Sequence, residues 1–159
     1  MSGVTRVYGD DEAGAKLVGR WRYTLTGPDG AIKDERVGTN VVCTNGKEFL
    51  ASFLYSAAVA ASTFTCRYVA IGTDATAEAA ANTALGTELA RVSGVVSYVS
   101  GAIYRVTGTF AAGTGTGAIA EYGVFSSSTG GTMLNRDTEA VINKGASDTL
   151  TATCELTIS

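Results

Sequence analysis

Residues 149–158 alternate strictly between polar and apolar side chains, and this pattern limits the possible folds more than any other feature of the sequence. Alternation sustained over such a length predicts an antiparallel strand with one face against a core and the other in water. Threonine dominates the wet face, which it suits because its branched side chain packs well on a pleated surface. The apolar face consists of Leu150, Ala152, Cys154, Leu156 and Ile158.

Further short strands follow one another along the chain, separated by turns rich in glycine, serine and threonine. The segment Gly27-Pro28-Asp29-Gly30 predicts a hairpin turn, because proline presets φ and glycine accepts a positive φ. Short strands at a spacing of roughly 8–12 residues predict an all-β fold, an antiparallel β-sandwich or jelly roll. Besides the strand at 149–158, the expected strands are 21–26, 31–37, 41–43, 66–71, 95–99, 104–110, 120–125, 133–134 and 140–142.

One segment has helical periodicity instead. Apolar residues recur at helical spacing between Phe49 and Ala57, so we expect one amphipathic helix at 46–58, with Thr44 and Asn45 as caps. The alanine-rich segment 76–86 favours helix by propensity, but its asparagine, threonine and bounding glycine predict a short or irregular one.

The first twenty residues show no periodicity and mix glycines with an acidic run. We interpret 1–20 as an N-terminal arm, either ordered only against a partner or simply frayed, and 21–159 as a single domain. Asp10, Asp11 and Glu12 lack the spacing of a calcium-binding loop, so a solvated acidic patch is the favoured reading.

Composition excludes several kinds of function. Histidine is absent, which removes the Ser-His-Asp triad, the Cys-His dyad and every histidine-ligated zinc site. The net charge of −3 argues against nucleic acid as a partner. Neither a membrane-spanning apolar run nor a secretory signal is visible, so we expect no membrane partner, and no cofactor loop is recognisable.

Cys43, Cys66 and Cys154 match no zinc or redox spacing. Buried thiols that act as small hydrophobic groups are the favoured reading, and a disulfide within or between chains is the alternative. The Gly-Thr repeat at 113–117 lacks the Gly-Lys-Ser/Thr ending of a phosphate loop, so we interpret it as a turn between antiparallel strands.

Four charged residues are candidates for a structural ion pair: Glu88, Arg91, Arg105 and Glu121. Glu121 lies within an otherwise apolar strand, and a carboxylate there needs a cationic partner. The favoured interpretation is an ion pair that links the segment 85–91 to the strand of Glu121. The alternative is an acid/base pair of Glu88 and Glu121 in an enzyme.

Several motifs resemble, in their order along the chain, a class of structural proteins from tailed-bacteriophage virions. These motifs are TNVVCTNGKEFLASFL at 39–54, YVAIGTDAT at 68–76, TALGTELAR at 83–91, IAEYGVFSS at 119–127, GTMLNR at 131–136 and SDTLTATCELTI at 147–158, preceded by the GPDG hairpin.

The resemblance implies a non-enzymatic virion protein, assembled in the bacterial cytoplasm. Its first placement is a capsid decoration, or cement, protein that binds the major capsid protein and itself, as a homotrimer or dimer. The other placement is a tail-fibre, collar or baseplate component. For decoration, the arm is the expected capsid contact, through backbone pairing in the manner of β-augmentation. The arm candidates are Val4, Arg6, Tyr8, Asp10 and Asp11.

A second function stays open at this stage. A β-sandwich can bind a carbohydrate or receptor by stacking on exposed aromatic rings, here Trp21, Tyr98, Tyr104 and Tyr122. Aromatic residues on strands more often belong to a core, so this reading ranks below the structural one.

Overall fold

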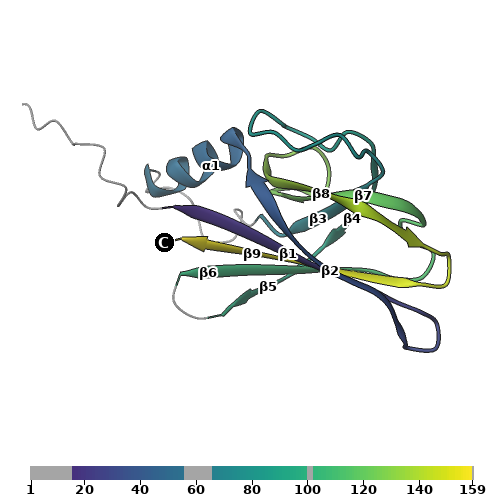
Figure 1. Ribbon diagram of the computed structural model, residues 1–159. Coiled ribbons are helices and arrows are strands. Elements are labelled where there is room, and N and C mark those ends of the chain that lie inside the picture. Colours follow the sequence, from purple (N-terminus) through teal and green to yellow (C-terminus); the bar gives the residue numbers. More distant parts are fainter. Residues whose placement is uncertain (1–15, 56–65, 100–101, 159) are drawn as a thin grey trace, which may run out of the picture.

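The computed structural model describes residues 16–55, 66–99 and 102–158, without the side chains of 51–55 and of Tyr98. Its elements (Figure 1) follow in the order β1 (Leu17–Thr26), β2 (Ile32–Val42), α1 (Thr44–Tyr55), β3 (Tyr68–Gly72), β4 (Glu88–Ser93), β5 (Val95–Tyr98), β6 (Ile103–Phe110), β7 (Gly117–Phe125), β8 (Met133–Lys144) and β9 (Thr149–Ile158).

All paired strands are antiparallel, so the all-β fold predicted from the alternating segments is confirmed. The strand order is β4-β3-β7-β8-β2-β1-β9-β6-β5. The strands form two layers. Sheet A contains β2, β1, β9, β6 and β5, and sheet B contains β4, β3, β7, β8 and the end of β2.

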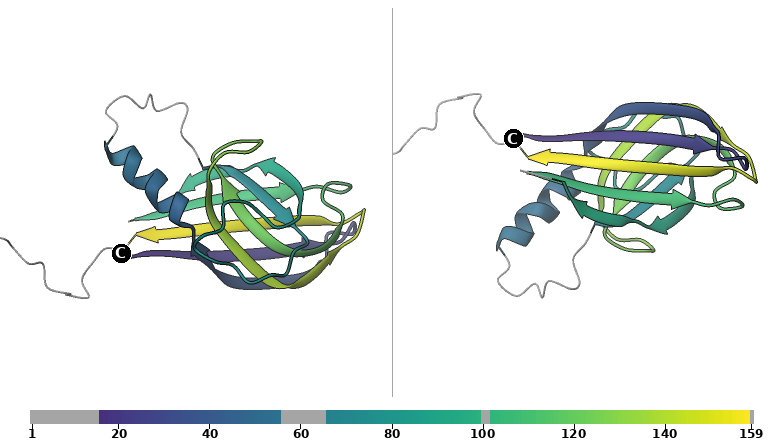
Figure 2. Two further views of the ribbon diagram at one scale, coloured as in Figure 1. Left: turned by 90° about the horizontal axis from the view of Figure 1, so that it is seen from above. Right: turned by 90° about the horizontal axis from the view of Figure 1, so that it is seen from below.

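The chain passes from one layer to the other at both margins, which makes the sandwich nearly a closed barrel (Figures 1 and 2). β2 pairs with β1 as far as Asn40 and with β8 at Val41 and Val42. At the opposite margin, β4 pairs with β3 and β5 pairs with β6, and a single residue, Gly94, joins β4 to β5. A bent strand at each margin leaves few unpaired sheet edges.

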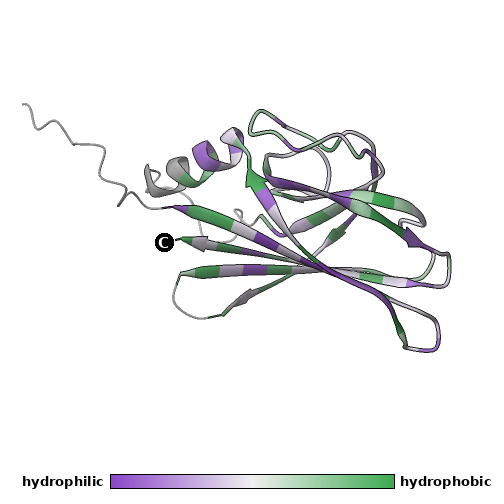
Figure 3. Ribbon diagram, viewed as in Figure 1, coloured by the Kyte–Doolittle hydropathy of each residue, from purple (hydrophilic) through white to green (hydrophobic). Residues whose placement is uncertain are grey.

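The main core lies between the two sheets and is built around aromatic rings. Tyr23 stacks on Tyr122 with ring centroids 3.8 Å apart, and Trp21 lies against both rings. All three side chains are fully buried. Along β1 and β6 the apolar and polar bands of Figure 3 alternate, since every second side chain points into this core.

β7 departs from alternation because both of its faces are covered. Ile119, Tyr122 and Val124 face the main core, whereas Phe125 belongs to a second cluster of buried apolar residues. That cluster lies on the outer side of sheet B and includes Leu85, from the segment between β3 and β4. This irregular segment covers the outer face of β7.

The helix and the alanine-rich segment agree with the predictions made from the sequence. α1 begins at Thr44, one of the two expected caps, and the end expected at 56–58 lies outside the described residues. Residues 76–86 form turns and bends, the irregular outcome expected from their composition.

The strands differ most from the predictions in three places, apart from shifts of a few residues at strand ends such as those of β3 and β7. The strands expected at 31–37 and 41–43 are one strand, β2, and those at 133–134 and 140–142 are one strand, β8. Polar residues interrupt both patterns because each strand changes its neighbour or contains a bulge. β4 was not predicted, since its side chains lie half in water and give no clear period.

The N-terminal boundary also differs. β1 begins at Leu17, and residues 17–20 pair with β9, the last two of them also with β2, so the domain starts before Trp21. The remaining part of the expected arm, 1–15, lies outside the described residues together with all five of its contact candidates, Val4, Arg6, Tyr8, Asp10 and Asp11.

Candidate binding face

The outer face of sheet A carries rows of polar side chains that cross from strand to strand. Arg20 of β1 is opposite Glu155 of β9, which is opposite Arg105 of β6. The next row runs from Val37 of β2 through Arg22, Thr153 and Thr107 to Val95 of β5. Figure 2 (right) looks onto this side of the molecule, where β1, β9 and β6 run next to one another. We call these two rows the arginine face.

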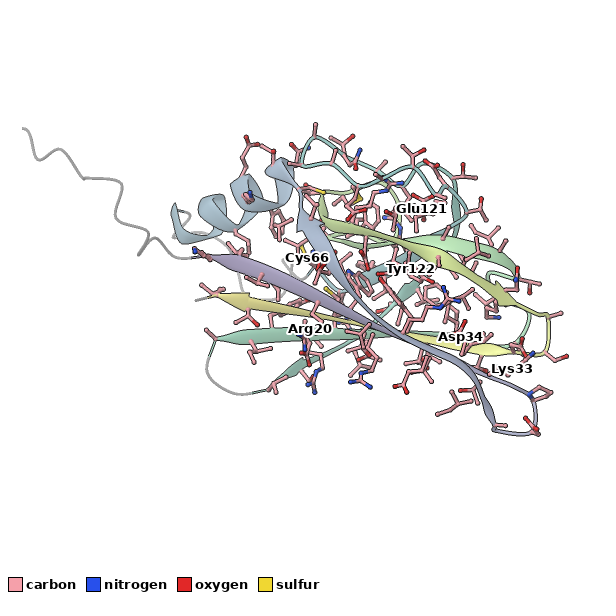
Figure 4. The ribbon with its side chains drawn as sticks, viewed as in Figure 1. Arg20, Lys33, Asp34, Cys66, Glu121 and Tyr122 are labelled. Carbon is pink, nitrogen blue, oxygen red and sulfur yellow. The ribbon has the colours of Figure 1, made fainter. Side chains whose placement is uncertain are left out.

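Three arginines on this face meet two carboxylates. Arg105 donates to Glu155 through Nε at 2.7 Å and through a second nitrogen, and Arg22 pairs with Glu35 at 2.7 Å. Arg20 has neither an ion pair nor a hydrogen bond to any side chain in the described part of the chain. Figure 4 shows Arg20 on the side of β1 away from Tyr122.

A hollow of about 350 Å³ lies between the three arginines. Its other lining side chains include Val37 and two threonines, Thr107 and Thr153, whose hydroxyl groups are 3.0 Å apart. The hollow therefore offers guanidinium donors, hydroxyl groups and one apolar wall.

Exposed valines extend this face of sheet A, and one of them, Val37, lines the hollow. Val18 and Val37 are each 53% exposed, and Val95 is 71% exposed. Residues directly opposite one another on neighbouring strands point to the same face of the sheet. Val37 therefore points outward together with Arg22. Apolar side chains standing in water among arginines are typical of protein-binding surfaces.

The second polar site is a buried ion pair under the segment 73–87. Glu121 is fully buried, and its carboxylate accepts hydrogen bonds from Arg136 at 3.0 and 3.1 Å. It also accepts from the backbone amides of Gly86 and Thr87, at 2.8 and 2.7 Å. A Cβ on Gly72 would collide with this carboxylate, so glycine is needed where β3 passes beneath it.

The structure therefore corrects the partner expected for Glu121. The carboxylate does hold the segment that precedes β4, but through backbone amides, while its cation is Arg136 of β8. Sequence reasoning missed Arg136. The available signal was a second charged residue in an apolar strand, in the GTMLNR motif.

The other candidates form separate pairs. Arg91 binds Glu88 at 2.6 Å and its guanidinium lies 3.6 Å from the centre of the Phe125 ring, a cation–π contact. Arg105 binds Glu155 on the arginine face. Glu88 and Glu121 both lie opposite Gly72 of β3, on strands either side of it, which places their backbones roughly 10 Å apart. The two carboxylates thus have different cationic partners.

A third polar cluster lies inside the barrel. The Tyr23 hydroxyl donates to Asp137 Oδ2, while Asp137 Oδ1 and the Tyr122 hydroxyl have no hydrogen-bond partner among the described groups. Burial, opposed by the hydrogen bond from Tyr23 and assisted by the charge of the neighbouring Glu139, raises the pKa of Asp137 to about 7. Burial likewise raises the pKa of Tyr23 and Tyr122.

The three cysteines are free and buried, as the favoured reading expected. Burial raises the pKa of Cys66 and Cys154 to about 12, so both are neutral thiols near pH 7. The Gly-Thr segment at 113–117 leads from β6 of sheet A to β7 of sheet B, and Gly113 and Gly115 have positive φ. It is a turn, but one that connects the layers and not a hairpin.

The described aromatic rings do not form the exposed stacking surface that the carbohydrate-binding hypothesis requires. Trp21 and Tyr122 are in the core with no exposed surface, and the Tyr104 hydroxyl donates to the Cys66 carbonyl oxygen. Tyr98 is the remaining candidate, and its side chain lies outside the described residues. Burial of the two rings removes the observation on which the carbohydrate reading rested.

Within the described ranges, no helix is long and apolar enough to cross a membrane, and no three residues of metal-binding type gather into a site. The fold and the arginine face thus define a barrel-like β-sandwich in which no other described element covers the polar outer face of sheet A. Comparison with protein-family models, curated proteins and solved structures finds no match to this chain.

Proposed function

We propose that this chain is a non-enzymatic structural protein of a tailed-phage virion, a capsid decoration protein that binds the major capsid protein through the arginine face. The virion assignment rests on the ordered motifs between residues 39 and 158 that resemble such proteins. The observation that carries the binding role is the outer face of sheet A, where three arginines stand among exposed valines.

The difference between the outer sides of the two sheets supports binding through the arginine face. The outer side of sheet B is covered by the segment that contains Leu85, which packs with Phe125 and Met133. On sheet A the side chains of the arginine face stand in water or are half-buried. A partner that covers the exposed valines removes apolar surface from water, and burial of such surface drives association.

Cosedimentation with purified capsids and purified tails tests the proposal. Val37→Glu places a negative charge in the wall of the hollow on the arginine face, and we expect at least about tenfold weaker capsid binding. Val141→Glu, at a valine of β8 that is 42% exposed, is the matched control and should bind as the wild type does.

Both variants should keep the circular dichroism spectrum of the wild type, since both side chains are exposed. Binding to tails instead of capsids would favour the fibre, collar or baseplate placement. Binding to neither particle, by the folded wild-type protein, would refute a virion role.

The N-terminal arm needs a revised deletion. Removing residues 1–20 would also remove four residues of β1 that pair with β9, two of which pair with β2 as well. Removing 1–15 leaves β1 intact. If the arm contributes to seating on the capsid, this shorter deletion lowers capsid binding while the unfolding midpoint stays unchanged.

A further inference from the structure

Arg20 is the one arginine of the arginine face without a carboxylate partner among the described residues. Strand register sets Arg20 directly opposite Glu155, but Glu155 accepts two hydrogen bonds from Arg105 on its other side. Arg22 is likewise held by Glu35. Among the described residues, the arginine face therefore has one more guanidinium than its carboxylates pair with.

The unpaired guanidinium borders the hollow described above. Arg22 and Arg105 line the same hollow, with Thr107 and Thr153 on its floor. A planar guanidinium presents a fork of donors that fits the two oxygens of a carboxylate, and such pairs are stronger than neutral hydrogen bonds. A carboxylate that enters the hollow meets Arg20 as a free donor.

We propose that the hollow binds a carboxylate side chain from an extended acidic segment of the partner protein, and that Arg20 is the residue that pairs with it. This inference deepens the proposed function, because it names the chemistry of the contact on the capsid side. The apolar wall at Val37 and the exposed Val18 suit the neighbouring side chains of such a segment.

The surroundings favour a protein carboxylate over a nucleic-acid phosphate. Glu155 stands in the same row as Arg20 and Arg105, and Glu35 is paired with Arg22, so both carboxylates would repel a continuous chain of phosphates. The whole chain carries a net charge of −3, which opposes binding to a polyanion. An acidic protein segment, in which uncharged side chains separate the carboxylates, lowers both penalties.

The test uses the full-length protein and a synthetic peptide in which Asp and Glu alternate with Ser and Val. A second peptide with Asn and Gln in place of the acids, and a single-stranded DNA oligonucleotide, serve as comparison ligands. Titrations followed by NMR should shift the side-chain signals of Arg20, Arg22 and Arg105 with the acidic peptide, and high salt should weaken the binding.

Charge variants assign the contact. Arg20→Glu should weaken binding of the acidic peptide about tenfold or more, and Arg20→Lys, which keeps the charge but loses the fork, should fall in between. Lys47→Glu makes the same change of charge at an exposed position in α1 and should bind as the wild type does.

Equal affinity of the wild type and Arg20→Glu for the acidic peptide would overturn the proposal, as would equal binding of the neutral peptide, tighter binding of the oligonucleotide, or no binding at low salt. The capsid experiment remains separate. If the peptide results hold but the wild-type protein binds no particle, the carboxylate site stands and the virion role fails.

Discussion

At the level of single residues, two buried carboxylates meet opposite surroundings. Glu121 accepts from Arg136 and from the amides of Gly86 and Thr87, so its charge is compensated. Asp137, one residue along β8 from Arg136, accepts from the Tyr23 hydroxyl and has one oxygen without a partner among the described groups. The first therefore stabilises the fold as an anion, and the second is more stable when protonated.

The pH dependence of stability should show the cost of ionising Asp137. Its pKa is about 7 in the folded protein and about 3.9 in an unfolded chain. Between these values the folded state keeps a proton that the unfolded chain has lost, so the free energy of unfolding falls as the pH rises and levels off above pH 7. Each unit of difference corresponds to about 1.4 kcal/mol, so the fall amounts to a few kcal/mol at most.

Asp137→Asn should flatten this decline, since the amide does not ionise and its oxygen still accepts from Tyr23. Urea denaturation at a series of pH values between about 5 and 8 measures the slope. Glu48→Gln, at an exposed position in α1, is the control and should keep the wild-type slope. A slope unaffected by Asp137→Asn would show that another group is responsible.

Glu121→Gln should destabilise the protein strongly, because it leaves the Arg136 guanidinium buried without its main partner. Loss of one member of a buried ion pair costs roughly 3–5 kcal/mol. Glu88→Gln, which breaks the partly exposed pair with Arg91, should cost less than about 1 kcal/mol. Chemical denaturation compares the two, and equal losses would contradict the structural role assigned to Glu121.

At the level of elements, α1 is held against β8 through a glycine. Gly46 lies in the first turn of the helix, and a Cβ there would collide with the carbonyl oxygen of Leu134. The backbone amide of Cys43, just before the helix, donates to the same oxygen at 3.1 Å. The close approach fixes where the helix starts relative to sheet B.

Gly46→Ala should therefore destabilise the protein, against the usual trend in helices. Replacing an internal helix glycine by alanine normally stabilises by roughly 0.5–1 kcal/mol. Here the collision with the backbone of Leu134 should outweigh that gain. Thermal unfolding gives the sign, with Lys47→Ala at the next, exposed position as the control, and a raised unfolding midpoint for Gly46→Ala would contradict the contact.

At the level of the whole molecule, Gly94 closes one margin of the barrel. Its amide donates to the Arg67 carbonyl oxygen at 2.7 Å, and a Cβ would stand 2.6 Å from a methyl carbon of Val106. Gly94→Ala should push β5 away from the interior and cost about 1–3 kcal/mol, as overpacking does.

Val95→Ala, at the neighbouring and highly exposed residue, should change stability by less than about 0.5 kcal/mol. Denaturation and the hydrogen exchange of β5 amides report the two effects. Wild-type exchange rates in Gly94→Ala would show that the margin does not depend on this glycine.

The sequence determined those features that depend on local periodicity. Alternation along 149–158 and 21–26 fixed which side chains of β9 and β1 are buried, and the helical spacing after Thr44 located α1. A lone charge in an apolar strand was enough to predict that Glu121 is ion-paired.

Only the tertiary structure decided which groups meet. Glu121 pairs with Arg136 and not with Arg91 because β8 lies next to β7, whereas β3 separates β4 from β7. Long-range packing sets this strand order. The same order placed Glu155 between Arg105 and Arg20 and left Arg20 without a carboxylate partner in the described part of the chain. Periodicity acts between neighbours in the chain, whereas the choice of partner depends on segments that meet only when the barrel closes.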